Sequence, residues 1–331
     1  MNGAQVQASA LVEQHFMAMG TPVLAALMAE EHRRTDAEIA LAEIEKLLVE
    51  FGREGWAWGV GALAQFNRTL GRGAAAQVPY LLRPLFARAW EIRRASGGLF
   101  EPRLGALVRL WGFDDPARQR SVPPPRAEID DLLEMLREAP AYRGEEWYGP
   151  APGVAWDLGA IGKGYIVDLA LDWLRRRGFG HAIVNAGGNV AARGRRGARA
   201  WRVGIRDPRS ESELPLLLAA LDAGDESVVT HGDDQRYFEH EGRRYSHVLH
   251  PLSGMPARGL RALTVVHADG TLADAGGAAL FAAGAGGWPL LAARLGIDKV
   301  LVVTEEGAVG ATAALAARLE PQPGVHIEVL S

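Results

Sequence analysis

The sequence contains no cysteine. This absence excludes disulfide bonds, thiolate nucleophiles, cysteine-based zinc sites and lipid attachment through an N-terminal cysteine. The first residues, MNGAQVQASALVEQHF, lack a basic segment and an unbroken apolar run, so no signal peptide is recognised. No apolar stretch of about 18 residues is evident elsewhere, which predicts that no segment spans a membrane. We therefore expect a cytoplasmic protein.

A strong excess of charge of either sign is also missing. The net charge is −4 and the isoelectric point is near 6.2, so the overall charge does not favour nucleic acid or an anionic membrane as a partner. The basic run at 175–177 ends an expected helix and is interpreted as solvated surface. With 48% hydrophobic residues among 331, the chain can bury a large core, as one domain or as two closely packed lobes.

Apolar periodicity divides the chain into a helical first part and a sheet-rich second part. Helices are expected from a capping box at 35–38 to about 51, and at 79–94 and 129–136. Strands are expected at 182–184, 201–205, 214–221, 228–229, 262–266 and 300–303, with a hairpin at 237–245. Alanine-rich helices are expected between the last strands, at 274–284 and 288–295. The predicted fold class is α+β.

The most informative segment is DLGAIGKGY at 157–165. Its three glycines leave the backbone bare, so that amides and carbonyls can approach a ligand closely. Asp157 and Lys163 provide polar side chains, and helical periodicity begins at Ile166. A glycine-rich loop before a helix suits a phosphate or carboxylate, because free N–H groups and the helix dipole favour an anion there. A structural turn that binds nothing explains these residues equally well.

Further polar clusters lie between the expected strands and helices. Each has an ordinary interpretation on its own, because an Asn-Gly-Gly segment is usually a turn and Asp274 is suited to be a helix N-cap. A single histidine is more often structural than catalytic. His247 and His250 are three residues apart, but Pro251 follows, so they do not share a helical face as metal ligands do.

The order of these segments resembles the ApbE family, the FAD:protein FMN transferases, over about residues 19–301. The matching segments are MGT at 19–21, FN at 66–67, GLFEP at 98–102, LWGF at 110–113, the motif at 157–165 with Asp168, NAGGN at 185–189, WRVGI at 201–205, THGD at 230–233, HVLHPLSGMP at 247–256 and AD at 273–274. So many matches in one order predict the fold of that family.

The resemblance implies a single catalytic domain at 15–320, made of two packed lobes at about 15–150 and 151–320, after a flexible N-terminus at 1–14. Such enzymes bind FAD in a cleft between the lobes and use a divalent cation, usually Mg²⁺, at the pyrophosphate. They transfer the FMN half to a Ser or Thr of a partner flavoprotein and release AMP. A metal that bridges pyrophosphate oxygens stabilises the leaving phosphate, so this chemistry is consistent.

The resemblance also assigns roles to individual positions of this sequence. The residues expected to line the flavin nucleotide are Met19, Leu99, Phe100, Glu101, Asp157, Lys163 and Leu249. Trp56 or Trp58 could stack on a ring of FAD, or be an ordinary surface or core aromatic. Ala160 is expected to offer a backbone carbonyl to the metal and Asp274 a carboxylate. His247 is the candidate that activates the acceptor hydroxyl or holds the nucleotide.

The chain departs from the family pattern mainly at the expected metal site. The family usually has Thr where this chain has Ala278 and sometimes an acid where it has Gly277; its Thr-Ser-Gly reads Thr-His-Gly around His231, and an Asp has become His250. Glu101 replaces an Asp, which is a milder change. Mg²⁺ prefers oxygen ligands, so these changes predict a weakened or altered site. The two histidines alternatively favour a softer ion.

These departures leave two alternatives to flavin transfer open. One is a catalytically weakened paralogue that holds FAD without reacting. The other is an FAD pyrophosphatase that uses water as the acceptor. Restoring an acid at Gly277 and a hydroxyl at Ala278 is expected to tighten Mg²⁺ binding.

Overall fold

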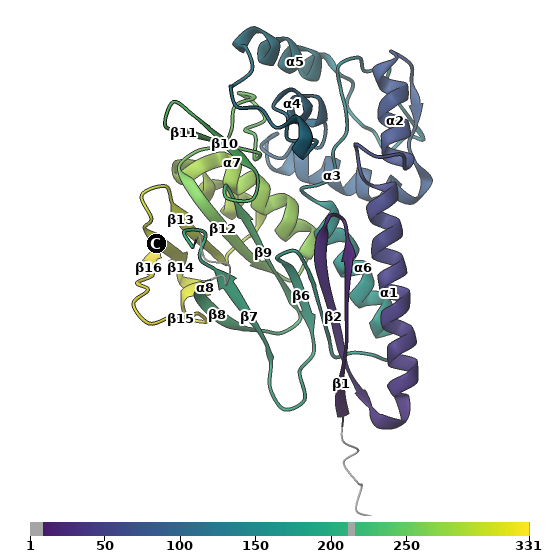
Figure 1. The fold of residues 1–331 in the computed structure, drawn as a ribbon, viewed down its shortest axis with the longest axis vertical. Helices are drawn as coiled ribbons and strands as arrows, with labels where there is room; N and C mark the ends of the chain where they lie inside the picture. Colours follow the sequence, from purple (N-terminus) through teal and green to yellow (C-terminus); the bar gives the residue numbers. More distant parts are fainter. Residues whose placement is uncertain (1–8, 211–215, 331) are drawn as a thin grey trace, which may run out of the picture.

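A computed structural model describes residues 9–210 and 216–330. Within them the largest sheet has nine strands in the order β1-β2-β5-β6-β9-β12-β13-β14-β16 (Figure 1). Its strands are β1 Ser9–Ala18, β2 Thr21–Glu30, β5 Ala182–Ala186, β6 Asn189–Arg193, β9 Glu226–Gly232, β12 Leu260–His267, β13 Val300–Thr304, β14 Val309–Thr312 and β16 Glu328–Leu330. Neighbours pair antiparallel except β14 and β16, which are parallel.

The central strands bury both faces, because successive side chains point to opposite sides of a sheet. On β12, Leu263 and Val265 face one core while Ala262 and Val266 face another. The first core is covered by helix α7, Gly270–Leu295. The second is covered by a smaller sheet of β7 Trp201–Arg206, β8 Leu217–Ala223 and β15 Glu320–Pro321, beside the short helix α8 Ala313–Ala316. This layering explains why apolar residues lie on both faces of β12 and β13.

The helices gather in two places (Figure 1). Helix α1, Arg34–Glu54, and helix α6, Gly162–Arg176, pack through Ile44, Leu48 and Leu171 on the β1–β2–β5 end of the large sheet. The others gather at one end of the molecule: α2 Ala62–Gly71, α3 Arg83–Ala95, α4 Gly105–Leu110 and α5 Arg126–Glu138, with the short β3 Ala76–Gln77 and β4 Trp147–Tyr148. Their core includes Trp156, stacked on Phe86 at 4.2 Å between ring centroids.

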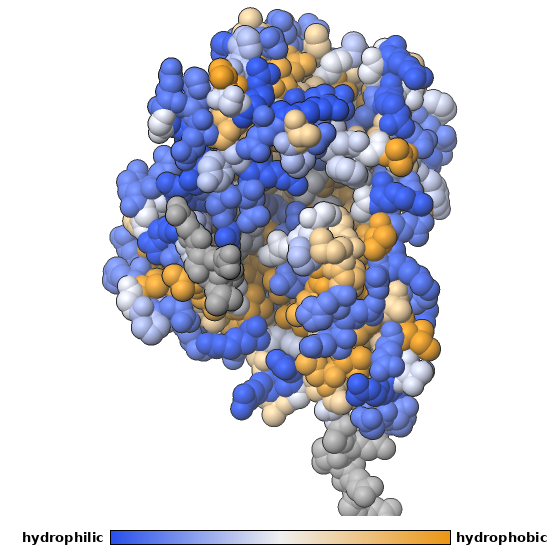
Figure 2. Space-filling view, viewed as in Figure 1, coloured by the Kyte–Doolittle hydropathy of each residue, from blue (hydrophilic) through white to orange (hydrophobic). Residues whose placement is uncertain are grey.

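The α+β class is confirmed, but the expected division of the chain near residue 150 does not describe the sheet. β1, β2 and α1 come from the first part, yet they pack on the strands of the second. Residues 9–14, expected in a flexible N-terminus, form the start of β1. On the face in Figure 2, apolar side chains gather over β1 and β2 amid a largely hydrophilic surface. β1 is the edge strand, and the exposed Glu13 and His15 interrupt its outer side, which discourages edge pairing.

Several local predictions are confirmed and others are wrong at helix starts. The hairpin of β10, Tyr237–His240, and β11, Arg243–Ser246, turns at Glu241 and Gly242 with positive φ of 50° and 70°. The predicted capping box is wrong, because α1 begins at Arg34 with no side-chain cap.

The two predicted alanine-rich helices form the single helix α7, which is interrupted by a non-helical Gly284. Residues 214 and 215 of the expected strand at 214–221 lie outside the described residues.

Helix α7 is long and apolar enough to cross a membrane by length and composition, with a mean hydropathy of 1.2 in its most apolar window. The sequence prediction that no stretch has this composition is therefore wrong. The composition has a packing explanation, because α7 covers one face of the large sheet and also contacts α6 and α3. Glycine and alanine along α7 allow these neighbours to approach closely.

The closest of these approaches is at Gly164 on α6. A Cβ there would collide with the Gly270 carbonyl and lie 2.8 Å from the Asp274 Cβ. We expect Gly164→Ala to lower the free energy of unfolding by about 1–3 kcal/mol, as overpacking does. Gly71→Ala on α2 is the control, since its Cβ would meet nothing within 4 Å. Urea unfolding of both variants measures the effect, and equal stabilities would contradict this account of the α6–α7 contact.

Candidate active site

The glycine motif forms a turn that leads directly into α6. Asp157 accepts a hydrogen bond from the Gly159 amide at 2.9 Å, and its own amide donates to the Pro102 carbonyl at 2.8 Å. The helix begins at Gly162, four residues before the predicted start. The Lys163 ammonium lies 3.4 Å from the Gly159 carbonyl. The motif therefore places an acidic side chain, Asp157, and a basic side chain, Lys163, on one compact turn.

Asp274 reaches this turn from α7. Its side chain is 1% exposed, and its Oδ2 accepts the Gly164 amide at 2.9 Å. The Gly164 amide is the one that would normally bond the Ala160 carbonyl one helical turn back. Because that amide is diverted, the Ala160 carbonyl accepts no hydrogen bond from the described residues. Asp274 is thus a buried carboxylate inside α7, and the N-cap of that helix is Asp269 instead.

His231, near the end of β9, lies against the same carboxylate. Its Nε2 is 4.0 Å from the Asp274 Oδ1. This nitrogen is buried and has no hydrogen-bond partner among the residues that the structure describes. Burial lowers the pKa of His231, while the negative charge of Asp274 opposes that shift. A Cβ on Gly277 would lie 2.6 Å from the imidazole, so the missing side chain leaves the space that the ring occupies.

His247 follows β11 and is held by backbone and aromatic contacts. Its amide donates to the Arg236 carbonyl at 3.0 Å, and its Nδ1 lies 3.3 Å from the same oxygen. Phe113 packs edge-on against its ring at 6.5 Å between centroids. Burial, together with the charge of Arg236, lowers the pKa of His247 to about 4. The imidazole is therefore neutral at pH 7 and can accept a proton.

Lys163 links these groups into one site. Its charge helps to lower the pKa values of His231 and His247. Burial raises the pKa of Asp157, and the Gly159 amide, Arg236 and Lys163 oppose that rise. The charge of Lys163 thus acts on Asp157, His231 and His247, and the charge of Asp274 acts on His231. Clusters of this kind are common at functional sites.

The pH dependence of the free energy of unfolding should show whether His247 is neutral in the folded protein. Its folded pKa of about 4 is below the usual 6.5, so the unfolded chain binds more protons between these values. We expect the free energy of unfolding to fall as the pH drops from 6.5 towards 4, and to fall less in His247→Gln. Asp157, Asp168 and Asp233 have raised pKa values and act in the opposite direction, so the difference between the two proteins is the informative quantity. Urea unfolding at several pH values measures it, and identical losses would contradict the burial of a neutral His247.

Other residues expected at the nucleotide lie beside the cluster. The loop that carries Leu99 runs next to 155–157, because the Gly105 amide donates to the Ala155 carbonyl at 2.9 Å. Phe100 and Leu249 are buried in hydrophobic cores, so their side chains are already engaged. Glu101 is buried and pairs with Arg93 at 2.5 Å and with Arg103 at 2.8 Å.

The other two predicted nucleotide residues lie in surface turns. Met19 and Gly20 form the turn of the β1–β2 hairpin with positive φ of 53° and 71°, and Met19 packs against Gly52. Trp56 is 56% exposed in the loop after α1. Its neighbour Trp58 lines a cavity and lies under Arg109 at 5.0 Å.

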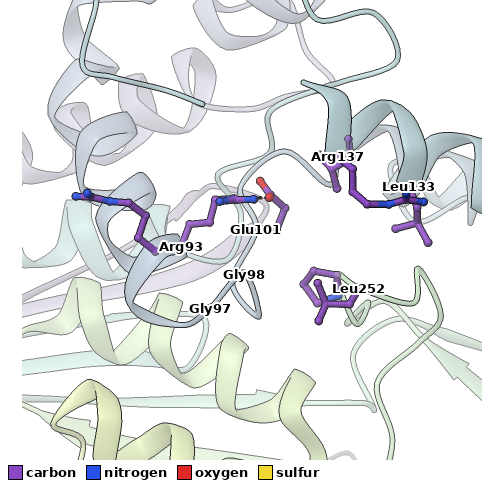
Figure 3. Close-up of a pocket in the computed structure, with 10 residues that line it drawn as sticks. Arg93, Gly97, Gly98, Glu101, Leu133, Arg137 and Leu252 are labelled. Carbon is purple, nitrogen blue, oxygen red and sulfur yellow. Dashed lines mark hydrogen bonds and ion pairs between the residues drawn. The ribbon is translucent and has the colours of Figure 1, made fainter. Parts of the chain in front are cut away.

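Two cavities occur near these loops, and neither is lined by Asp157, Lys163, His247 or Asp274. One of about 310 Å³ lies between the end of α3, α5 and the loop at 250–254; Figure 3 shows Arg93 reaching towards Glu101 there, with Arg137 and Leu252 on its far side. The other, of about 510 Å³, lies between α2 and α4 and includes Trp58.

Comparisons with known proteins identify the family of the chain. Residues 19–301 match the sequence pattern of the ApbE family. The chain belongs to the ApbE family. The FAD:protein FMN transferase of Rhodobacter capsulatus is 33% identical over 321 residues, which are 95% of this chain and 59% of that protein. The transferase of the same name from Klebsiella pneumoniae is 31% identical, with 86% of both chains covered.

Solved ApbE structures have the same fold. The ApbE protein of Thermotoga maritima superposes with a TM-score of 0.82 at 26% identity, covering 93% of this chain and 99% of that one. The flavinyl transferase ApbE of Pseudomonas stutzeri gives 0.79 at 26% identity, covering 94% and 97%. The mixed α+β fold expected from the sequence is therefore that of the ApbE proteins.

The structure adds one residue to the site that the sequence reading did not single out. Arg236 lies beside His247 and its charge acts on both His247 and Asp157. Its guanidinium also donates to the Phe113 carbonyl at 3.3 Å. A single arginine before a hairpin has no sequence pattern that marks it as a site residue. Its position depends on the fold, which brings Phe113 of the LWGF segment against the hairpin.

Proposed function

We propose that this chain transfers FMN from FAD to a Ser or Thr of a partner flavoprotein and releases AMP. The observation that carries the proposal is the meeting of Asp157, Lys163 and Asp274 at the start of α6, with His247 within the influence of the Lys163 charge. The ApbE relatives of this chain bear that enzyme name. Because the chain spans only 59% of the Rhodobacter relative, the activity of that whole protein is a proposal for this chain.

We place the FAD pyrophosphate beside Lys163, where the ammonium can neutralise part of its charge. FAD would extend from the helical end of the molecule to the sheet, in the cleft between two lobes that the sequence predicts. Leu99 and Met19 lie on loops that reach this region, and Trp56 or Trp58 is the aromatic offered to a ring. Trp56 is 56% exposed in the loop after α1 and needs little movement to meet a ring, whereas Trp58 is partly buried beneath Arg109.

A divalent ion at the pyrophosphate would neutralise the charge that develops on the leaving phosphate. The residues fit such an ion in part. Within the described part of the chain, Oδ1 of Asp274 and the Ala160 carbonyl accept no hydrogen bond. Ala278, one turn after Asp274, offers no side-chain oxygen. No group of three His, Cys, Asp or Glu side chains suited to a metal occurs in 9–210 and 216–330. Water and phosphate oxygens would complete the shell, as Mg²⁺ accepts.

The chain's own residues supply the proton transfer. The neutral His247 accepts the proton of the acceptor hydroxyl while the hydroxyl oxygen attacks the FMN phosphorus. The bond between that phosphorus and the bridging oxygen breaks, and AMP leaves with the bridging oxygen. Arg236 and Lys163 then face an imidazolium, which favours its return to the neutral form. General base catalysis of this kind contributes about 10²–10⁴-fold.

Product analysis separates the three candidate functions. The protein is incubated with FAD, Mg²⁺ or Mn²⁺, and a candidate acceptor, and flavins and AMP are separated by chromatography. Transfer predicts AMP without free FMN, and only when the acceptor is present. A pyrophosphatase would release AMP and free FMN without an acceptor. A binding protein would retain FAD and release neither, which would overturn the proposal.

A further inference from the structure

The buried Nε2 of His231 is the least explained polar atom of the site. It is buried, and no group within residues 9–210 and 216–330 forms a hydrogen bond with it. Proteins leave few buried polar atoms without a partner, so each such atom calls for an explanation. The backbone of His231 is held in β9 opposite Leu263 of β12, and its side chain is only 12% exposed. The unpaired nitrogen is therefore built into the fold and is not the product of a loose surface ring.

The nearest anionic atom suggests what the nitrogen is for. The 4.0 Å between His231 Nε2 and Asp274 Oδ1 is too long for a hydrogen bond. It is shorter than twice a metal–ligand bond of about 2.1 Å. One ion can thus touch both atoms with little movement of either side chain. The other oxygen of Asp274 is held by the Gly164 amide, which fixes the carboxylate.

Glycine at 277 makes this arrangement possible. A Cβ there would lie 2.6 Å from both Cδ2 and Nε2 of the His231 ring. Gly277 is on the same face of α7 as Asp274, one turn on. The His231 ring therefore fits only because residue 277 is glycine. Ala278, the next residue, has no side-chain oxygen that could take the place of the imidazole as a ligand. The structure also alters the substitution expected from the sequence, because Gly277→Asp cannot be accommodated unless His231 is replaced as well.

We propose that His231 is a metal ligand, and that its imidazole, the Asp274 carboxylate and the Ala160 carbonyl form a mixed nitrogen–oxygen site for a divalent transition-metal ion. An imidazole is a poor ligand for Mg²⁺ and a good one for first-row transition metals. The nitrogen thereby takes the place of the oxygen that Ala278 lacks. This inference rests on the proposed position of the metal at Asp274, and it does not depend on flavin transfer taking place.

His250 is not part of this site. Its Nδ1 accepts the Leu252 amide at 3.3 Å in the turn beside α5, and no described contact joins it to Asp274. Replacing it removes one imidazole from the protein without changing the proposed ligands. It is therefore the matched control for His231.

The test is electron spin-echo spectroscopy of the protein with Mn²⁺, recorded with and without FAD. We expect modulation from one directly bound ¹⁴N nucleus, which disappears in His231→Ser and remains in His250→Ser. Mn²⁺ affinity should fall at least tenfold in His231→Ser, within the range of about 10–100-fold seen for lost metal-site partners. Mg²⁺ affinity should change much less.

A second pair of variants tests the geometry without removing the imidazole. Gly277→Ala should push the ring away and abolish the nitrogen modulation. Gly286→Ala, on the same helix with open space around its Cβ, should keep it. Circular dichroism confirms that each variant is folded.

Mn²⁺ bound without nitrogen modulation, modulation that persists in His231→Ser, or no Mn²⁺ binding at all would each overturn the proposal. These readouts involve no turnover. A protein that binds Mn²⁺ through nitrogen but releases no AMP from FAD would retain this inference while contradicting the proposed function.

Discussion

Asp274→Asn is expected to lower the rate of AMP release from FAD by at least about 100-fold, in the range seen when one electrostatic group of an active site is removed. The amide can still accept the Gly164 N–H through its oxygen, so the α6–α7 contact is retained. The lost charge is the effect under test. Initial rates with FAD and acceptor measure it, and the unfolding midpoint shows whether the fold is kept.

Asp172→Asn is the matched control, because this acid lies on α6 with its side chain 42% exposed. It should retain the full rate. If Asp274→Asn were folded and within a few-fold of the parent rate, Asp274 would not be a metal ligand, and the placement of the pyrophosphate would fail with it.

His247→Gln is expected to lower the rate of transfer by about 10²–10⁴-fold, the usual contribution of a general base. Affinity for FAD should change far less, since the base acts on the acceptor hydroxyl. The parent enzyme should show a rate that is constant between pH 6 and 8, because the pKa of His247 is about 4. Single-turnover rates across this range measure both effects.

His250→Gln removes a nearby imidazole from a surface turn and should change neither the rate nor its pH dependence. A parent rate that rises steeply between pH 6 and 8 would contradict the neutral His247. An unchanged rate in His247→Gln would assign the imidazole to binding or support, which was the other role the sequence left open.

The sequence predicted the parts of the site that are local or that occur as ordered segments. The 157–165 motif does lead into a helix, and Asp274 does lie opposite it. The helix starts were less predictable. Asp269 and Asp274 both precede apolar, glycine-rich residues, and only the fold reveals that Asp269 caps α7 while Asp274 lies within it. Tertiary packing, through Gly164 and Gly270, decides between them.

The relation between His231 and Gly277 could not be read from the sequence, because it joins β9 to α7 across the core. Each appeared as a separate departure from the family pattern, and each suggested a weaker metal site. Together they form one packing unit with Asp274. The same limit applies to β1 and β2, whose place in the large sheet depends on pairing with β5, more than 150 residues away.

The central claim is covalent transfer of FMN, and intact-protein mass measurement of the acceptor tests it most directly. After incubation with FAD and a divalent ion, we predict an acceptor heavier by one FMN moiety, with one AMP released for each adduct. The adduct should be absent when the acceptor's Ser or Thr is replaced by Ala, and when Asp274→Asn replaces the parent enzyme. An acceptor of unchanged mass, under Mg²⁺ and Mn²⁺ alike and with FAD bound, would contradict the account.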